Sequence, residues 1–293
     1  MSNHSHPAPP IVLVIAGFDP SCGAGIAADL KTIAAHNGYG VAAVTAVTVQ
    51  STKGVLSVHA MPHATLRAQL DALAEDVKPG AIKIGMLANK ANASVVAEFL
   101  ERFKRTPIVL DPVIMPSSGG VELLDAGGVK FLTEDLLKLA TVVTPNIAEA
   151  SLLSGMEIKD ISGMEAAARK LVERGARAVV IKGGHMEKPI DVLFDGKEIL
   201  TFGGDQVKTE NTHGSGCTFA SAIAAQLAAG RPLRDAVLLA KTYVQKAIEH
   251  GFSIGKGAGP LDHFYRTHQE PPTRGVHEVP QHGMHPAAEP AAH

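Results

Sequence analysis

The sequence predicts an α/β fold in which a mostly parallel central sheet lies between layers of helices. Short, continuously apolar runs alternate along the chain with segments whose apolar residues recur at helical spacing, a pattern typical of parallel sheets covered on both faces. Hydrophobic residues make up 45% of the 293 residues, which is enough for a large core. A chain of this length is compatible with one α/β domain.

The predicted strands are short and rich in Val, Ile and Ala. Residues 11–15 are apolar at every position, as expected for a strand that is buried on both faces. Residues 191–202 are different, because two short apolar runs flank Asp195-Gly196, which predicts an antiparallel hairpin. The predicted strands of the main sheet are 11–15, 41–50, 81–84, 108–111, 141–143 and 178–181.

The predicted helices fall between these strands and after the hairpin. One ends near Gly38 and another stops before Pro79, residues that commonly terminate helices. The six predicted helices are 24–37, 65–77, 91–104, 163–174, 214–229 and 233–250. We therefore expect one domain over residues 11–266, preceded by a flexible lead at 1–10 and followed by a disordered His- and Pro-rich tail at 267–293.

Composition excludes several classes of partner. A formal net charge of −2 gives no electrostatic reason to expect nucleic acid or an acidic membrane, and 4% aromatic residues without Trp do not suggest a base-stacking platform. No run is long and apolar enough to span a bilayer, and the N-terminus lacks a signal-peptide core. The two cysteines, Cys22 and Cys217, are too few for a disulfide scaffold, so we expect a small-molecule ligand and a cytoplasmic location.

The segment 211–217, Asn-Thr-His-Gly-Ser-Gly-Cys, leads directly into the predicted helix 214–229. Small residues at a helix start expose backbone N–H groups and the helix dipole adds positive potential, so Gly214 and Gly216 are candidates for an anion site. Cys217 falls on the first turn, where we expect a lowered thiol pKa, and is a candidate base for a substrate hydroxyl. The alternative is a glycine-rich turn with Cys217 packed as a small hydrophobic residue.

A second glycine cluster, Gly17-Phe-Asp-Pro-Ser-Cys-Gly-Ala-Gly25, follows the first strand and precedes a helix that contains Asp29. It matches neither the G-x-G-x-x-G nor the G-x-x-x-x-G-K-[ST] pattern. Its position at the carboxyl end of a strand is nevertheless where open α/β sheets bind ligands. The alternative for Asp29 is a favourable charge near a helix N-terminus or on a solvated face.

Polar residues also follow three later strands. Asp111 ends one of them, and Asn146 and Glu149 follow the next, so carboxylate and amide oxygens are available for Mg²⁺. Asn146 and Glu149 also fit a helix-capping box, which is at least as good an explanation for Asn146. Lys182 leaves a buried strand and Lys256 lies in a glycine-rich loop; each is either a phosphate contact or a solvated lysine.

Taken in order, seven segments resemble the hydroxymethylpyrimidine and phosphomethylpyrimidine kinases of thiamine biosynthesis. Each motif is weak alone, but seven in the family's order over about residues 11–265 are specific. The segments are 15–32, Lys83-Ile-Gly-Met-Leu87, Asp111-Pro-Val113, Thr144-Pro-Asn146 with Glu149, Lys182-Gly-Gly-His185, 211–217 and 255–260.

The resemblance implies a ribokinase-like fold, MgATP as the phosphoryl donor and a homodimer, and all three are expectations here. The expected substrates are 4-amino-5-hydroxymethyl-2-methylpyrimidine and its monophosphate. The resemblance also implies a role for each candidate site residue. The pyrimidine would be bound by Gly17, Asp29, Gln50 and Met86, the base would be Cys217, and the anion hole would be formed by Gly214 and Gly216. Mg²⁺ would be bound by Asp111 and Glu149, and the nucleotide by Asn146, Lys182, Thr209 and Lys256.

The sequence departs from the family pattern at four positions. Cys22 stands where the family usually has Gly, Ala27 where Gln is frequent, Ser51 where Asn is common, and Ser117 where a lysine is usual. These departures bear on substrate preference and on the second phosphorylation.

Two other functions and one other site stay open at this point. A pyridoxal kinase shares the fold and a similar cysteine loop, and its substrate also carries a hydroxymethyl group on a six-membered nitrogen ring. A non-catalytic vitamin-binding protein on the same scaffold is the alternative from another class. The histidines of the tail are compatible with metal binding, although a polar extension explains them more simply.

Overall fold

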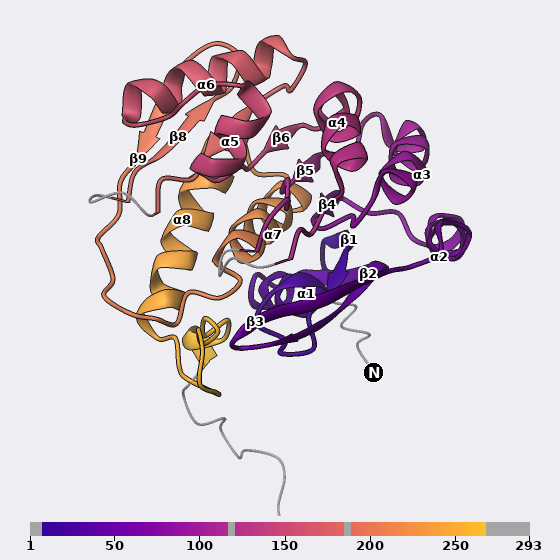
Figure 1. Cartoon of the computed structure of the whole chain (residues 1–293), viewed down its shortest axis with the longest axis horizontal. Coiled ribbons are helices and arrows are strands. Elements are labelled where there is room, and N and C mark those ends of the chain that lie inside the picture. Colours follow the sequence, from indigo (N-terminus) through magenta and orange to yellow (C-terminus); the bar gives the residue numbers. More distant parts are fainter. Residues whose placement is uncertain (1–7, 117–120, 185–188, 268–293) are drawn as a thin grey trace, which may run out of the picture.

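A computed structural model describes residues 8–116, 121–184 and 189–267 of the chain. Its centre is one nine-stranded sheet with the strand order β3-β2-β1-β4-β5-β6-β7-β8-β9 (Figure 1). The strands are β1 (Ile11–Phe18), β2 (Tyr39–Ser51), β3 (Gly54–Ala60), β4 (Ala81–Ile84), β5 (Ile108–Leu110), β6 (Val142–Val143), β7 (Val179–Ile181), β8 (Asp191–Phe194) and β9 (Ile199–Phe202).

Six of these strands form the parallel part of the sheet. β2, β1, β4, β5, β6 and β7 pair in parallel, whereas β3 at one edge and β8 and β9 at the other pair antiparallel. The mostly parallel sheet and the hairpin at Asp195-Gly196 are therefore confirmed. Gly196 takes a positive φ of 89° in this turn, and the Asp195 carboxylate accepts hydrogen bonds from the backbone of Lys197 and Glu198.

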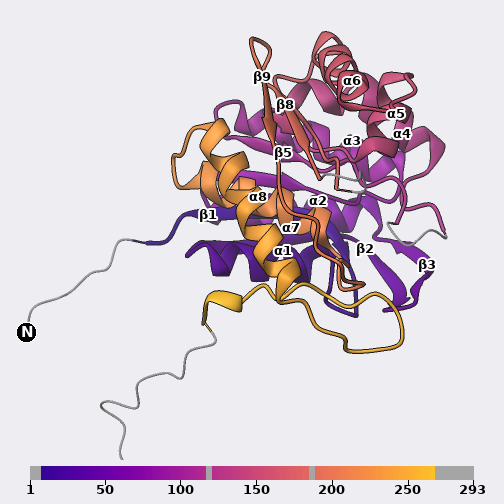
Figure 2. The same cartoon turned by 90° about the vertical axis from the view of Figure 1, so that its left-hand side faces the viewer.

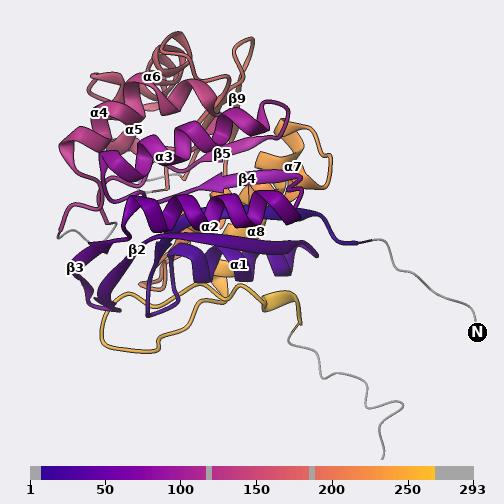
Figure 3. The same ribbon diagram turned by 90° about the vertical axis from the view of Figure 1, so that its right-hand side faces the viewer.

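The helices form two layers, one on each face of the sheet. Figure 2 shows α1, α7 and α8 on one face, and Figure 3 shows α2 to α6 on the other. The α-helices are α1 (Gly25–Ala35), α2 (His63–Asp76), α3 (Lys90–Leu100), α4 (Ala126–Glu134), α5 (Ile147–Ser154), α6 (Ile161–Glu173), α7 (Ser215–Ala228) and α8 (Leu233–Glu249). Short 3-10 helices are η1 (Glu101–Phe103), η2 (Leu136–Leu139) and η3 (Tyr265–Thr267).

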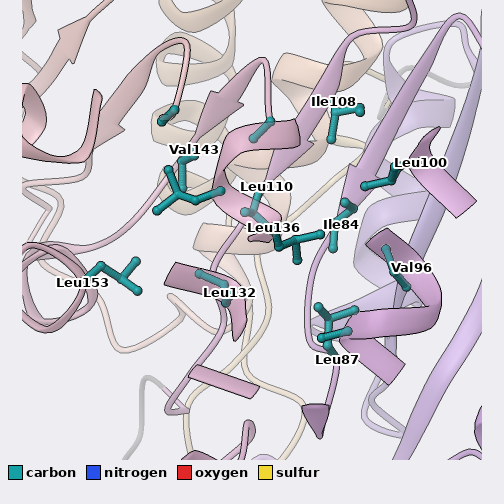
Figure 4. Packing of buried hydrophobic residues seen from close by; sticks show 14 of the residues in the cluster. Ile84, Leu87, Val96, Leu100, Ile108, Leu110, Leu132, Leu136, Val143 and Leu153 are labelled. Atoms are coloured by element: carbon teal, nitrogen blue, oxygen red, sulfur yellow. The ribbon is translucent and has the colours of Figure 1, made fainter. Parts of the chain in front are cut away.

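The sheet separates two hydrophobic cores. Alternate residues of a strand point to opposite faces, so Leu13 and Ile15 of β1 pack against the layer of α2 to α6, while Val12 and Val14 pack against α1, α7 and α8. Figure 4 shows part of the first core, in which Ile84 lies among side chains of the helical layer. Burial on both faces explains why β1 is apolar at successive positions.

One strand and two α-helices were not predicted from the sequence. β3 is only partly buried: Val55 is buried, whereas the next residue, Leu56, is 76% exposed. Its sequence therefore lacks the continuous apolar run of a strand that is buried on both faces. α4 contains two glycines and α5 has only eight residues, and both features weaken a helical pattern.

Parts of the predicted ends lie outside the described residues. Residues 1–7 of the predicted lead and 268–293 of the predicted tail belong there, as do Ser117 and His185. Within the described ranges, none of the helices has the length and apolarity needed to cross a membrane.

Acid should destabilise the fold through one buried histidine. His263 is 4% exposed, its Nε2 lies 3.2 Å from Thr218 Oγ1 at the start of α7, and burial lowers its pKa to about 4. The unfolded chain therefore binds a proton near the ordinary histidine pKa while the folded protein does not, so stability is lost as pH falls below about 6.5. Between pH 7.5 and pH 5 this histidine should cost about 2 kcal/mol of unfolding free energy.

Urea unfolding at the two pH values measures this loss. His263→Gln keeps a polar atom near Thr218 without a titrating ring and serves as the comparison. The pH-dependent part of the unfolding free energy should shrink by about 2 kcal/mol in that variant. An unchanged pH dependence would show that other groups govern acid sensitivity.

Candidate active site

A cavity of about 580 Å³ lies at the carboxyl ends of the parallel strands, where open α/β sheets bind ligands. Eleven of the thirteen predicted site residues line it, and Asp29 and Lys256 do not. The residues that the structure brings together are Gly17, Gln50, Met86, Asp111, Asn146, Glu149, Lys182, Thr209, Gly214, Gly216 and Cys217.

The N-terminus of α7 forms one wall of the cavity. Gly214 is the N-cap residue of this helix and has a φ of 84°, which a glycine adopts easily. A Cβ atom at Gly214 would collide with the carbonyl oxygen of Gly23, so the two glycine-rich loops are in close contact here. The helix start thus faces the cavity with small residues, which is the arrangement that binds phosphates at helix N-termini.

Charged side chains stand directly beside this helix start. Lys182 Nζ lies 2.9 Å from Asp111 Oδ1, and Thr144 Oγ1 donates to the same carboxylate at 3.3 Å. A Cβ atom at Gly216 would lie 3.1 Å from Lys182 Nζ, so glycine keeps the lysine close to the first turn of α7. A phosphoryl group at this place would meet a lysine cation and the positive end of a helix dipole together.

Asn146 and Glu149 form a capping box at the start of α5. The Asn146 side chain accepts from the Glu149 backbone at 2.9 Å, and Glu149 Oε2 accepts from the Asn146 backbone at 2.8 Å. Burial raises the pKa of Glu149 to about 7, against the opposing effect of Lys182, and nearby Asp111 raises it further. The capping alternative for Asn146 is therefore correct, and both residues still line the cavity.

The donor set around Asp111 and Glu149 fits Mg²⁺. Magnesium sites in proteins commonly use one or two carboxylates, with water and substrate phosphates completing the octahedron. The Asp111 carboxylate is close enough to raise the pKa of Glu149, and both residues line the cavity beside Lys182. Among the described residues no group of three or more His, Cys, Asp or Glu could hold a metal by itself.

The thiol of Cys217 faces the cavity from the first turn of α7. Burial raises its pKa to about 11, an effect that outweighs the nearby Lys83 ammonium. The sequence-based prediction of a lowered pKa is therefore wrong: burial of the thiolate and the charges of Asp29 and Asp111 outweigh the lowering effects of Lys83 and of the Gly25 backbone. At neutral pH the thiol is protonated in this structure.

Another part of the cavity suits a flat ring. Met86 is 7% exposed, and a Cβ atom at Gly17 would lie 2.9 Å from its sulfur. Glycine at position 17 therefore leaves room for the methionine side chain. Gln50 extends from β2 with its carboxamide between Thr48 and His213, 3.0 Å from Thr48 Oγ1 and 3.3 Å from His213 Nε2. A thioether and an amide are suitable partners for a small nitrogen heterocycle.

Two predicted residues are not part of the cavity lining. Asp29 is fully buried, with its carboxylate 2.8 Å from Lys83 Nζ and 2.7 Å from Ser221 Oγ. Burial raises the pKa of Asp29, against the opposing effect of Lys83. Lys83, and not Asp29, lines the cavity. Lys256 is exposed in a loop whose neighbouring glycines pack on Thr52.

Sequence reasoning missed several polar residues that line the cavity, among them Lys83, Asp19, His213 and Lys241. Lys83 had a usable signal, because it is a charged residue inside a fully buried strand. Asp19 and His213 belong to the two glycine-rich segments, and their carboxylate and ring lie 2.8 Å apart. Lys241 of α8 lines the cavity and forms a 2.9 Å ion pair with Asp191, a contact between residues too far apart in sequence to be foreseen.

The positive φ of Cys22 predicts a stabilising substitution. Cys22 has a φ of 58°, a left-handed conformation that disfavours residues with a Cβ atom. Cys22→Gly should raise the unfolding free energy by about 0.5–1 kcal/mol, after allowing for the greater freedom of glycine in the unfolded chain. Urea unfolding checks this, with Cys22→Ala as the control that keeps the Cβ atom. Equal stability of the two variants would contradict the strain argument.

Comparison with known proteins gives a consistent picture. Residues 19–262 match the family model described as phosphomethylpyrimidine kinase. The hydroxymethylpyrimidine/phosphomethylpyrimidine kinase of Synechococcus elongatus is 45% identical over 259 residues, which cover 87% of this chain and 98% of that protein. The thiamine biosynthesis bifunctional protein of Geobacter sulfurreducens is 45% identical over 255 residues, 86% of this chain and 52% of that protein.

Solved structures with the same fold include two related kinases. The pyridoxal kinase of Staphylococcus aureus in complex with AMP-PCP and pyridoxal superposes with a TM-score of 0.82 at 35% identity, covering 90% of this chain and 97% of that one. The phosphomethylpyrimidine kinase of Clostridium difficile superposes with a TM-score of 0.73 at 35% identity, covering 82% and 99%.

Proposed function

The chain belongs to the phosphomethylpyrimidine kinase family, and we infer from this that it phosphorylates 4-amino-5-hydroxymethyl-2-methylpyrimidine and then its monophosphate, with ATP as donor. The products are the monophosphate and the diphosphate used in thiamine biosynthesis. One observation carries the inference: a phosphate-binding wall and a ring-binding wall meet around a single cavity. The start of α7, Lys182 and Asp111 form the first wall, and Gln50 and Met86 belong to the second.

The chemistry divides among the residues of the phosphate wall. Phosphoryl transfer depends mainly on positioning and on stabilisation of charge on the phosphoryl oxygens. Lys182 and the backbone N–H groups at Gly214 and Gly216 supply positive potential to the transferred group. Asp111 and Glu149 would hold Mg²⁺, which neutralises phosphate charge when bound, and Asn146 and Thr209, which also line the cavity, would contact the nucleotide.

Cys217 orients the hydroxymethyl oxygen and takes its proton during the first phosphorylation. Burial favours the thiol, so Cys217 must first release its own proton to solvent; the thiolate then accepts the hydroxymethyl proton as that oxygen bonds to the γ-phosphorus and ADP leaves. Lys83 is the nearby cation that favours the thiolate. In the second phosphorylation the acceptor is a phosphate oxygen that is already largely ionised, so the demand on a base is smaller.

A coupled ATP assay with product identification tests the proposed function. Hydroxymethylpyrimidine, its monophosphate and pyridoxal are offered side by side to the full-length protein. Turnover of both pyrimidines well above pyridoxal is the expected result. Failure to phosphorylate either pyrimidine would refute it.

Pyridoxal kinase activity is a second candidate, because pyridoxal-binding neighbours share the fold over 90% of this chain. The same assay separates the two. Preference for pyridoxal would be consistent with the same kinase mechanism but would assign the protein to vitamin B6 salvage. The departure at Ser51, next to Gln50, is the first described position to examine in that case.

We propose in addition that the protein is a cytoplasmic homodimer. Both Cys22 and Cys217 are free thiols, which fits a reducing compartment. Val47, Val49 and Leu56 of β2 and β3 are exposed by 40%, 46% and 76%, so the edge of the sheet carries apolar side chains available for a subunit contact. Light scattering coupled to size-exclusion chromatography tests this, and a mass near 30.5 kDa would refute the dimer.

A further inference from the structure

Lys182 is the counter-ion of the Asp111 carboxylate. Its Nζ atom lies 2.9 Å from Oδ1 of Asp111, and Thr144 Oγ1 donates to the same oxygen at 3.3 Å. The two charged side chains are only 16% and 3% exposed, so salt and water screen them little. A carboxylate in such surroundings is costly without a cation beside it, and here the chain itself supplies the cation.

Glu149 acts on the same ammonium. Burial lowers the pKa of Lys182, but the charges of Asp111 and Glu149 raise it by more, so the ammonium is protonated at neutral pH. The two carboxylates that fit Mg²⁺ therefore share one cation of the chain.

The backbone that carries this ammonium is fixed, whereas its side chain can change partner. The Lys182 N–H donates to the Pro145 carbonyl oxygen at 2.9 Å, and the Gly183 N–H donates to Asp191 at 2.9 Å. A Cβ atom at Gly183 would collide with the carbonyl oxygen of Ile190, so the chain is tightly packed here. Because lysine has a long, flexible stem, rotation of the side chain alone can move Nζ from one anion to another.

The first turn of α7 places a second anion site within reach. A Cβ atom at Gly216 would lie 3.1 Å from Lys182 Nζ and 3.9 Å from Asp111 Oδ2. The ammonium and the carboxylate therefore both lie beside the helix start that suits a phosphate. Phosphate oxygens bound at this helix start would compete with Asp111 for the ammonium, since both form charge-assisted hydrogen bonds.

We propose that Lys182 and Mg²⁺ are alternative counter-ions of Asp111, and that Lys182 opposes metal binding until nucleotide phosphates attract its ammonium. Two cations at one carboxylate repel each other, and the repulsion is strong where the dielectric constant is low. The ammonium therefore weakens metal binding while it stays on Asp111, and it ceases to do so once it has moved to a phosphate. This exchange rests on the proposed use of MgATP.

The exchange couples the metal to the nucleotide. Coupling between two ligands is reciprocal, so phosphates that remove Lys182 from Asp111 strengthen metal binding, and a metal on Asp111 frees Lys182 for the phosphates. Lys182 thus favours entry of the metal together with the nucleotide over entry of the metal alone.

Titration with Mn²⁺ in the absence of nucleotide, followed by the electron paramagnetic resonance signal of the free ion, tests the opposition without any turnover. Lys182→Met removes the competing charge and keeps a long side chain, so Mn²⁺ should bind at least about tenfold more tightly than to the wild-type protein. Lys182→Gln can still donate a hydrogen bond to Asp111, should show a similar gain, and guards against misfolding of the methionine variant. Equal Mn²⁺ affinity of the wild-type protein and the variants would overturn the proposal.

Lys241→Met is the matched control. Lys241 lines the same cavity, and its Nζ lies 2.9 Å from Asp191, with side chains exposed by 13% and 5%. It removes the same charge away from the Asp111 carboxylate and should change Mn²⁺ affinity less than about twofold. Asp111→Asn added to Lys182→Met should abolish the gain. A gain that Lys241→Met reproduces, or that survives Asp111→Asn, would overturn the proposal, because it would reflect a general effect of charge or a metal bound elsewhere.

Calorimetric titration with ADP in the presence of a chelator tests the other half of the exchange. Lys182→Met should bind ADP about tenfold more weakly than the wild-type protein, because the phosphates lose the ammonium as a partner. Unchanged ADP affinity would overturn the exchange, since it would show that Lys182 stays on Asp111. If the wild-type protein phosphorylates neither pyrimidine, the proposed function fails, and the two titrations still decide the role of Lys182.

Discussion

Cys217→Ala should lower kcat for phosphorylation of hydroxymethylpyrimidine by about 10²- to 10³-fold, the usual contribution of a positioned general base. An alcohol proton must leave during this step, and Cys217 is the thiol that lines the cavity at the start of α7. Phosphorylation of the monophosphate should suffer less than about tenfold, because an ionised phosphate oxygen needs no base. The measurement is kcat with each acceptor offered alone.

Cys22→Ala is the matched control, since Cys22 is the other free cysteine and does not line the cavity. Its activity should equal that of the wild-type protein. Because burial raises the pKa of Cys217 to about 11, the first step should accelerate as pH rises from 8 to 10, and Cys217→Ala should lose that slope. Equal losses in both phosphorylation steps would refute the role of the thiol as a base.

Gly214→Ala should harm both stability and catalysis. The substitution forces a Cβ atom into a left-handed conformation with a φ of 84° and against the carbonyl oxygen of Gly23. Backbone strain and overpacking together should cost about 2–5 kcal/mol of unfolding free energy. Displacing the N–H groups at the start of α7 should also lower kcat by about 10²-fold.

Gly230→Ala separates the effect of strain from that of the site. Gly230 follows the other end of α7 with a φ of 79°, and a Cβ atom there would meet nothing within 4 Å. It should cost about 1 kcal/mol and leave kcat unchanged. Urea unfolding and kcat measured well below the melting temperature check both variants. If the two alanine variants lost equal stability and activity, the close contact between the glycine-rich loops would be unimportant.

The elements of the parallel sheet were predictable because each strand is a short apolar run bounded by polar or turn residues. The order of strands was not, since it depends on which distant runs pair. β3 escaped prediction because only part of it is buried, which leaves an irregular pattern such as exposed Leu56 next to buried Val55. α4 escaped because Gly127 and Gly128 dilute its helical character.

The site was predictable wherever a residue at a strand end or a helix start faces the cavity directly. It was not predictable where a distant partner decides the outcome. Asp29 is turned into the interior by Lys83, which is 54 residues away in sequence. The pKa of Cys217 follows from tertiary burial, and a rule based only on the helix N-terminus gives the opposite direction.

The division of the core by the sheet has a consequence for synthesis on the ribosome. The buried residues of the core under α2 to α6 have all been made once Phe194 is added, whereas the opposite face of β1 still lacks α7, α8 and Leu261. At about 5–20 residues per second, the roughly 70 intervening residues leave an apolar face of the nascent chain uncovered for about 4–14 s. The segment that finally covers it also carries Gly214 and Cys217, so the emerging polypeptide acquires these two cavity residues only as its last apolar surface is shielded from chaperones and from other chains.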